Sequence, residues 1–238
     1  MDIINVTQVM ISILLMLVML SILVLPHVIA WVKYIRWQHK LRLKHHENAF
    51  NDLYEEVNGF IISKKARSNQ DSLDYVYGEI NFLSFIALLC LVNPCEDTIF
   101  YDLGSGTGKA VLACAMVFGV KQSIGVELFT ALHQAALVQR ERLKKRPEYH
   151  ARAARVRLIN QNFIDVDFSN ATLIFINATS FIGPVWQQLS QRLSMVKENT
   201  IVITTSKPLD TSRFCLLYKN PIQMSWGIVQ AYIYRKIN

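Results

Sequence analysis

The stretch TIFYDLGSGTGK, residues 98–109, decides the fold class of this 238-residue chain. Its first half has the apolar and β-branched residues of a buried strand, and its second half is a glycine-rich turn that leads into the apolar helical pattern of residues 109–119. The glycines let a ligand approach the backbone closely, and the first turn of a helix offers free N–H groups. The stretch therefore predicts a strand, a turn and a helix, with a ligand site at the turn.

Strand-like and helix-like segments alternate around this stretch. Helices are expected over residues 81–92, 129–146 and 184–196, and further strands over 122–128, 156–163, 171–179 and 200–206. Two late strands, 214–219 and 228–237, are expected to pair antiparallel. Alternation with right-handed crossovers predicts an α/β, Rossmann-like fold, in which a mostly parallel sheet with an antiparallel closing hairpin carries helices on both faces.

Two carboxylates at predicted strand ends indicate which ligand the turn binds. Glu127 ends the second strand, where a carboxylate can accept hydrogen bonds from a ribose diol. Asp102 stands two residues before Gly104, where it would repel a pyrophosphate and accept an ammonium group. The glycine spacing is G-x-G-x-G, whereas dinucleotide-binding turns have G-x-G-x-x-G. This pattern favours S-adenosylmethionine (SAM) over a dinucleotide, and a tight turn without a ligand is the remaining alternative.

The N-terminal segment has the composition of a membrane span. Residues 9–25 hold twelve Leu, Ile or Val, three Met, two Ser and no charge, and those twelve side chains favour insertion by about 4–7 kcal/mol. The five Lys and Arg of residues 33–46 all follow this segment, so the positive-inside rule predicts a cytoplasmic catalytic domain. We expect an anchor over 1–32, a basic helical stalk or linker over 33–73 with a flexible break at 63–72, and a domain over 74–238.

The net charge of +7 is concentrated in two segments. Residues 140–157 hold eight Lys and Arg and two Glu. Together with residues 33–46 they carry more positive charge than the net charge of the whole chain. Charge this local argues against a chain that coats nucleic acid along its length, and nucleosome contact has no further support. The four cysteines form no CxxC pair, so the sequence predicts neither a disulfide framework nor a metal site, and it makes no prediction of oligomeric state.

Six blocks in one order resemble the disruptor-of-telomeric-silencing family, the histone lysine methyltransferases that lack a SET domain, and more closely its small microbial relatives. The blocks are Tyr77-Gly78-Glu79, FYDLGSGTGK (100–109), Gly125-Val126-Glu127, IFINATSF (174–181), Thr205-Ser206-Lys207-Pro208 and Met224-Ser225-Trp226-Gly227 followed by AYIY. The resemblance covers residues 74–238. It implies a class I SAM-dependent methyltransferase, with SAM as cofactor and a protein lysine as acceptor.

The resemblance also implies the site residues. Those expected to bind the cofactor are Tyr77, Glu79, Asp102, Gly104, Ser105, Gly106, Gly108, Lys109, Glu127, Asn162, Phe163 and Asn177. The residues expected at the methyl-transfer channel are Asn177, Phe181 and Tyr232. The chain departs from the family pattern at Asn162, where an Asp usually holds the adenine amino group, and at Ala231, the first of two paired tyrosines in the family.

These departures leave two other functions open. One is a SAM-dependent methyltransferase that acts on a small molecule or a lipid headgroup, since the cofactor motif does not specify the acceptor. The other is a catalytically silent SAM-binding module on a membrane.

Overall fold

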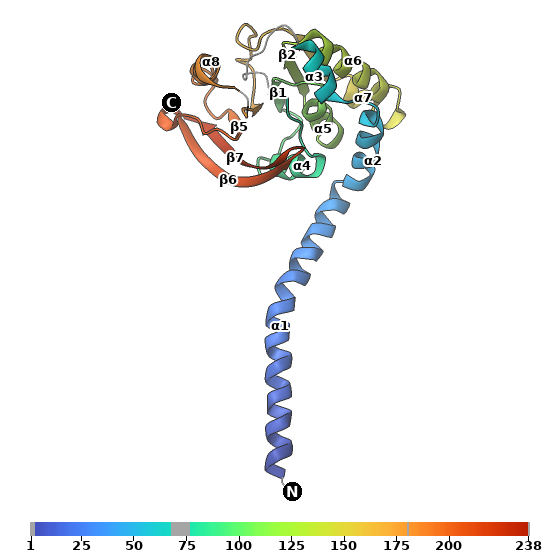
Figure 1. Cartoon of the computed structure of the whole chain (residues 1–238), viewed down its shortest axis with the longest axis vertical. Helices are drawn as coiled ribbons and strands as arrows, with labels where there is room; N and C mark the ends of the chain where they lie inside the picture. The colour runs from blue at the N-terminus through green and yellow to red at the C-terminus, as the bar shows by residue number, and fades with distance from the viewer. Residues whose placement is uncertain (1–2, 68–76, 180, 238) are drawn as a thin grey trace. The chain divides into compact units, whose positions relative to one another are not determined.

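The computed structural model describes residues 3–67, 77–179 and 181–237 of the chain. It consists of two compact units, Met1–His45 and His46–Asn238, and most of their helices and strands are labelled in Figure 1.

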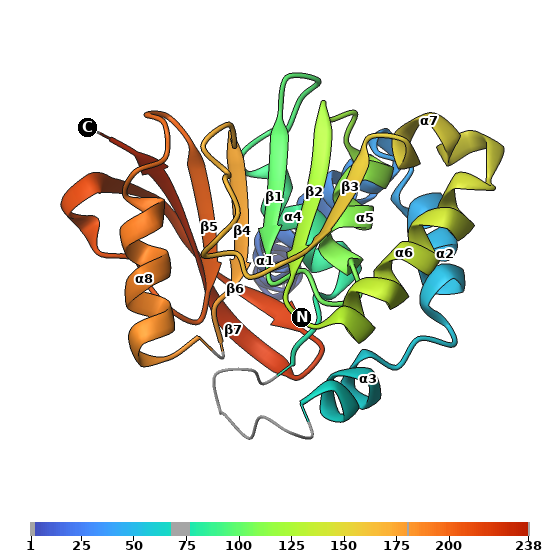
Figure 2. The same ribbon diagram turned by 90° about the horizontal axis from the view of Figure 1, so that it is seen from above.

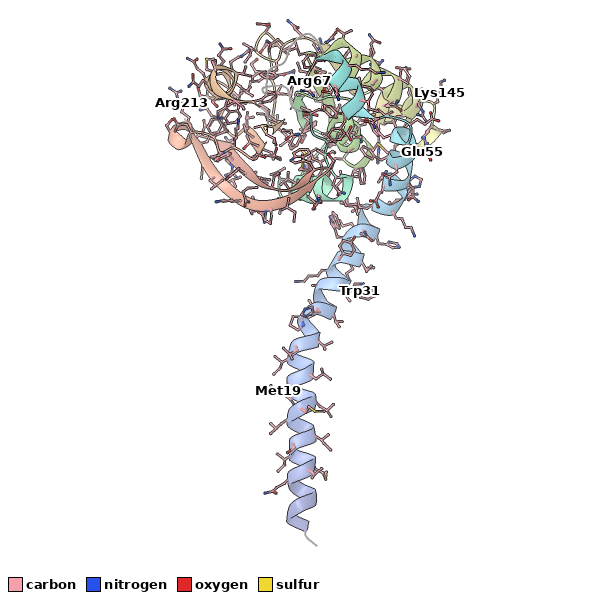
Figure 3. The ribbon with its side chains drawn as sticks, in the orientation of Figure 1. Met19, Trp31, Glu55, Arg67, Lys145 and Arg213 are labelled. Atoms are coloured by element: carbon pink, nitrogen blue, oxygen red, sulfur yellow. The ribbon has the colours of Figure 1, made fainter. Side chains whose placement is uncertain are left out.

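The first unit is dominated by one long helix, α1 (Ile3–Lys40). Its apolar side chains point outward along the helix, as Figure 3 shows for Met19 and Trp31, which are 65% and 64% exposed. The part from Gln8 to Lys40 is long and apolar enough to cross a membrane, and none of its most apolar stretch is buried inside the protein. By length and composition this helix is the predicted span. Leu41 and Arg42 separate it from α2 (Leu43–Tyr54).

The second unit is built on a seven-stranded sheet with the order β3-β2-β1-β4-β5-β7-β6, seen in Figure 2. The strands are β1 (Ile99–Leu103), β2 (Gln122–Glu127), β3 (Val156–Asn160), β4 (Leu173–Asn177), β5 (Ile201–Thr205), β6 (Phe214–Met224) and β7 (Gly227–Lys236). The first five pair in parallel, and β7 runs antiparallel to both β5 and β6. The predicted fold class is therefore confirmed, including the closing hairpin.

Helices cover both faces of the sheet. On one face the ring of Phe85, from α4 (Phe82–Cys90), lies 5.0 Å from the ring of Phe175 and 6.3 Å from that of Phe100. On the other face, alternate residues such as Leu103 of β1 join side chains from α8 (Gly183–Leu193) in one buried cluster. Because successive strand residues point to opposite faces, Asp102 shares the face of Phe100.

The remaining helices are α3 (Gly59–Ala66), α5 (Lys109–Val117), α6 (Thr130–Lys144) and α7 (His150–Ala153), with short 3-10 turns at Pro147–Tyr149 and Thr211–Arg213. The structure corrects one prediction here. Residues 63–66 of the expected flexible break are the last turn of α3, and the part of that break from residue 68 lies outside the described residues. Residues 46–66, which the sequence assigned to the stalk, belong to the second unit.

The basic segment 140–157 is largely occupied in stabilising the fold. The guanidinium group of Arg142 donates to the carbonyl of Leu53, at the end of α2, at 3.1 Å. Arg152 donates to the carbonyl of Met116, near the end of α5, and Arg155 donates to the carbonyls that follow α5. Cations at helix C-termini satisfy free carbonyls and interact favourably with the helix dipole, so much of this charge is structural.

Candidate active site

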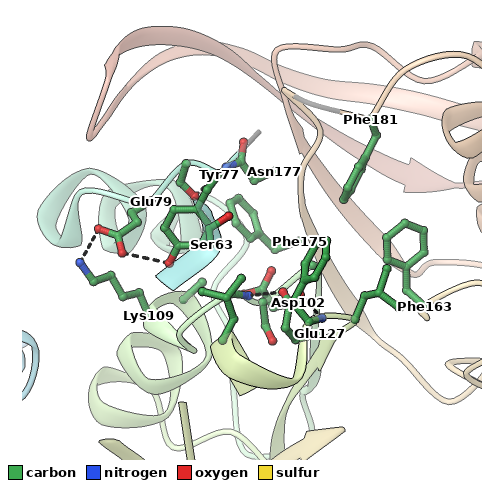
Figure 4. A pocket seen from close by; sticks show the side chains of 18 of the residues that line it. Ser63, Tyr77, Glu79, Asp102, Lys109, Glu127, Phe163, Phe175, Asn177 and Phe181 are labelled. Atoms are coloured by element: carbon green, nitrogen blue, oxygen red, sulfur yellow. Dashed lines mark hydrogen bonds and ion pairs between the residues drawn. The ribbon is translucent and has the colours of Figure 1, made fainter. Parts of the chain in front are cut away.

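A pocket opens where the parallel strands β1, β2 and β4 end. Its empty volume, which includes the part open to solvent, is about 1060 Å³. The sheet order places β2 and β4 on either side of β1: the chain winds from β1 through β2 to β3 on one side, and then crosses to β4 and β5 on the other. Open α/β sheets bind ligands in the crevice at such a switch point. Figure 4 shows the side chains that converge there, from the cofactor loop (residues 102–109), Glu127, the Tyr77–Glu79 segment and the end of β4.

The cofactor loop has a backbone that requires glycine. Gly104, Gly106 and Gly108 have φ values of 92°, 55° and 82°, a region that other residues rarely adopt. At Gly106 a Cβ atom would also lie 2.8 Å from Cε2 of Tyr77. The N–H of Gly108 donates to the carbonyl of Ser105 at 2.8 Å, which closes the turn before α5 begins. The loop thus exposes backbone to the pocket.

Glu127 shapes this loop as well as facing the pocket. Its Oε2 accepts from the N–H of Gly106 at 2.7 Å and its Oε1 from the N–H of Phe129 at 2.8 Å. Burial raises the pKa of this carboxyl, while the backbone N–H donors of Phe129, Gly106 and Leu128 lower it. Each oxygen keeps a further lone pair, so ribose hydroxyls can still bind there. The sequence predicted the ligand role and missed the bond to the loop.

Asp102 is the strongest candidate in the pocket for binding a cation. Its side chain is 2% exposed, and its Oδ1 is one of two buried side-chain oxygens without a hydrogen-bond partner in the described structure. Burial, and to a lesser extent the charge of Glu127, raises the pKa of Asp102 well above its usual value. A buried oxygen that lines a pocket and has no partner is costly unless a ligand satisfies it. The ammonium group in the amino-acid part of SAM fits this position.

Tyr77 and Glu79 close one side of the pocket through a buried polar cluster. The hydroxyl of Tyr77 donates to Oε1 of Glu79 at 2.9 Å, and Nζ of Lys109 donates to Oε2 of Glu79 at 2.6 Å, as drawn in Figure 4. Burial, followed by the charge of Glu79, raises the pKa of Tyr77, which keeps this phenol protonated. All three side chains line the pocket, so the structure brings them together as the resemblance implied.

The tip of the β6–β7 hairpin holds the Tyr77–Glu79 segment in place. The N–H of Ser225 donates to the carbonyl of Glu79 at 3.0 Å, and the N–H of Glu79 donates to Oγ of Ser225 at 3.2 Å. The ring of Trp226 covers Gly78 so closely that a Cβ atom at residue 78 would overlap it. The sequence had identified both blocks, but nothing in either one indicated that they contact each other.

Asn177 connects the end of β4 to the same segment. Its Nδ2 donates to the carbonyl of Gly78 at 3.1 Å, and its Oδ1 accepts from the hydroxyls of Thr179 and Thr205 at 3.0 and 2.8 Å. This amide is therefore fixed in orientation at the wall of the pocket. It can position groups on either side, and its oxygen has little capacity left for a ligand.

Two phenylalanines form the apolar wall opposite. The rings of Phe163 and Phe181 are 5.1 Å apart, and Phe181 lies over the cofactor loop, where its Cζ would be 3.1 Å from a Cβ atom at Gly104. Nζ of Lys207 donates to the carbonyl of Phe181. Asn162 also lines the pocket, and its Oδ1 accepts from the N–H of Ile164 at 3.0 Å.

Tyr232, predicted at the methyl-transfer channel, lies on β7 of the closing hairpin. It is half-buried on β7, paired with Thr204 of β5, and its ring lies 6.3 Å from that of Tyr234 and 5.7 Å from Nζ of Lys219. The described residues that line the pocket do not include it. They do include Ser63 of α3 and Gln188 of α8, which the sequence gave no reason to select.

A metal site has no support in the part of the chain that is described, because no group of three or more His, Cys, Asp or Glu residues is arranged to hold an ion. The pocket instead combines exposed loop backbone, two buried carboxylates and an apolar wall. These residues fit SAM, which carries an ammonium group, a ribose and an adenine ring.

Comparison with known proteins identifies the family. The family described as Histone methylation protein DOT1 matches residues 60–226. A histone-lysine N-methyltransferase, H3 lysine-79 specific, from Kluyveromyces lactis is 34% identical over 86 residues, which cover 35% of this chain and 15% of that protein. A protein-lysine N-methyltransferase from Saccharolobus islandicus is 31% identical over 87 residues, covering 37% and 50%. The chain thus spans half the length of these relatives or less.

Solved structures agree on the fold. A candidate RNA methyltransferase from Pyrococcus horikoshii superimposes with a TM-score of 0.56 at 12% identity, over 80% of this chain and 97% of that one. A candidate methyltransferase from Escherichia coli gives a TM-score of 0.51 at 14% identity, over 65% and 86%. At such identities these two structures inform on the fold alone, which is that of class I SAM-dependent methyltransferases. The family match covers more than half of the chain, and the chain therefore belongs to the DOT1 family.

Proposed function

We propose that this chain is a SAM-dependent protein-lysine N-methyltransferase, held at a membrane by residues 1–32 with its catalytic domain in the cytoplasm. The observation that carries the proposal is the pocket. In it the unpartnered Oδ1 of Asp102 and the strand-end Glu127 lie beside the fixed amide of Asn177 and the ring of Phe181. Family membership and the lysine methyltransferases among the relatives support the same reading.

The cofactor supplies an electrophilic methyl group on a sulfonium, so the protein mainly has to bind and align. In this proposal Asp102 binds the ammonium group, and Glu127 accepts the ribose hydroxyls. Asn177 and Phe181 orient the two reacting groups. Holding reactants in line can lower the activation barrier by several kcal/mol or more. When bound there, SAM would supply the methyl group to the lysine nitrogen and would be released as S-adenosylhomocysteine.

The acceptor amine must lose its proton before it attacks. A free lysine has a pKa of about 10.4, and an apolar environment lowers that value because it disfavours the charged form. The wall formed by Phe163 and Phe181 provides such an environment beside the pocket. By family resemblance, no single side chain of the site needs to act as a strong base, and desolvation would favour the neutral amine.

The membrane part of the proposal rests on α1. Its segment from Gln8 to Lys40 has a mean hydropathy of 2.9 over its most apolar window, and it is unburied. The basic residues of 33–46 follow it directly, which favours a cytoplasmic domain.

The test uses the full chain, purified in detergent, with methyl-tritiated SAM. It is incubated separately with membrane, cytosolic and nucleosomal fractions, and labelled protein is hydrolysed to amino acids. We expect label in methyl-lysine, and the labelled fraction identifies the class of acceptor. Asp102→Asn is the matched control, because it keeps the shape of the side chain and removes its charge. Cofactor binding without any label in protein would contradict the proposal and favour a small-molecule acceptor or a silent module.

A further inference from the structure

Residues 46–66, which connect the N-terminal helix to the domain in sequence, lie against the cofactor loop. The hydroxyl of Tyr54, the last residue of α2, donates to the carbonyl of Thr107 at 3.1 Å. The ring of Tyr54 is 6% exposed, and Nζ of Lys109 lies over it, 5.1 Å from its centre. A side chain from outside the predicted domain thus contacts two residues of the loop.

This hydrogen bond occupies a specific place in the loop. Thr107 lies between Gly106 and Gly108, the two glycines with φ values of 55° and 82°. The N–H of Gly106 is held by Glu127 at 2.7 Å, so the loop backbone is fixed by Glu127 before Thr107 and by Tyr54 at Thr107. Burial is the main cause that raises the pKa of Tyr54, and the phenol therefore remains a hydrogen-bond donor.

Helix α3 completes the contact on the other side of the loop. Its first residue, Gly59, packs against Tyr77 and Glu79 so closely that a Cβ atom would overlap both side chains. The ring of Phe60 meets that of Tyr77 edge to face, with centroids 5.3 Å apart. Ser63, which is 1% exposed, lines the pocket itself.

The same segment is fastened to the domain at a second place, away from the cofactor loop. His46 Nδ1 and the hydroxyl of Tyr149 are hydrogen-bonded at 2.6 Å, and both side chains are buried. Arg146 pairs with Asp52, and Arg142 donates to the carbonyl of Leu53. Contacts that only dock α2 can therefore be separated from the contact that reaches the loop.

We propose that Tyr54 is a positioning residue for the cofactor loop, and that residues 46–66 are part of the cofactor site. The inference rests on the proposed function only for the identity of the ligand. Loss of the Tyr54 hydroxyl would leave the Thr107 carbonyl without this partner and loosen the loop. We therefore expect a larger loss in the free energy of cofactor binding than in the free energy of unfolding.

The experiment compares Tyr54→Phe and Tyr149→Phe in the full chain in detergent. Each change removes one buried hydroxyl: that of Tyr54, which belongs to α2, or that of Tyr149, which is hydrogen-bonded to His46 of α2. Only the first of them touches the cofactor loop. The dissociation constant of S-adenosylhomocysteine is measured by calorimetry, and the melting temperature is measured without ligand. We expect Tyr54→Phe to weaken binding roughly tenfold, the scale of one lost hydrogen bond. Tyr149→Phe is expected to lower the melting temperature and to leave the dissociation constant unchanged.

Each outcome decides something different. If Tyr54→Phe binds as the wild type does, or if Tyr149→Phe weakens binding equally, the inference is overturned while the proposed function stands. If the wild-type chain does not bind S-adenosylhomocysteine, the proposed function fails, and the inference fails with it.

Discussion

The two halves of the pocket differ in how the chain builds them. The cofactor half takes the loop of residues 102–109 and Glu127, which adjacent strands bring together within about 25 residues of sequence. The half proposed for the acceptor takes Asn177 and Phe181, next to the Tyr77–Glu79 segment that closes the cofactor side, and the hydrogen bonds here join residues up to 146 positions apart. The first half is therefore local in sequence, and the second depends on the complete fold.

Glu127→Gln is expected to damage the cofactor half most. The change removes the charge and one of the two acceptor oxygens. In the wild-type chain these oxygens bind the N–H groups of Gly106 and Phe129. Hydrogen bonds to a charged group contribute about 1.5–3 kcal/mol, so S-adenosylhomocysteine should bind about 100-fold more weakly. Calorimetry measures this, and Glu141→Gln, at an exposed residue paired with Arg140, is the control. A change below about fivefold would contradict the role given to Glu127.

Asn177→Ala is expected to affect the acceptor half in a different way. The carbonyl of Gly78 and the hydroxyls of Thr179 and Thr205 lose their common partner. Small misplacements in an active site can lower a rate about 100-fold, and we expect a loss of about 30-fold in methyl transfer at saturating SAM. Cofactor affinity should fall much less. Equal losses in rate and affinity would show that the two halves are not separable at this residue.

Gly106→Ala tests the backbone of the loop. An alanine at a φ of 55° costs about 1–2 kcal/mol, and its Cβ would meet Tyr77. We expect cofactor binding to weaken about tenfold and the melting temperature to fall. Gly119→Ala is the matched control, since no atom lies within 4 Å of a Cβ placed there. If the two variants behave alike, the loop conformation does not limit binding.

The pH dependence of binding should report on Asp102. Its pKa is raised in the folded chain, so the stability associated with its protonation is fully present below its unfolded pKa of about 3.9. That stability is lost as the pH rises through the folded pKa. An ammonium ligand prefers the ionised carboxylate, and affinity for S-adenosylhomocysteine should therefore rise severalfold over that same interval. Calorimetry at a series of pH values over which the chain stays folded measures the slope, which Asp102→Asn should flatten. An unchanged slope in that variant would remove Asp102 from the ammonium site.

Tyr232→Phe is expected to have the smallest effect. The side chain packs beside Tyr234 and under Lys219, and it lies outside the described lining of the pocket. Methyl transfer should stay within about twofold of the wild type, measured with tritiated SAM. A loss of tenfold or more would place the hydroxyl at the acceptor channel, as the family resemblance implied, and would extend the acceptor half to β7.

The sequence predicted the cofactor half well because its information is local. A strand, a glycine turn and a strand-end carboxylate each follow from short-range rules, and β1, β2 and Glu127 lie where those rules place them. The contact of Trp226 with Gly78 had no such signal, since it depends on how a hairpin meets a segment far away in the chain. Tyr54 and Ser63 were hidden for the same reason, because a polar, helical stretch after an apolar helix reads as a stalk. The position of Tyr232 depends on which face of the sheet its side chain lies on. The alternation of residues in β7 did not determine that face.

The bonds between Glu79 and Ser225 also set a time at which the site can form. Ser225 follows Glu79 by 146 residues, so the ribosome must add all of them before this wall of the pocket can close. At about 5–20 residues per second, that interval is roughly 7–30 s. During synthesis the nascent chain therefore carries a complete cofactor motif but no complete site. The wall formed by the Tyr77–Glu79 segment is complete only when the last hairpin has emerged and folded back.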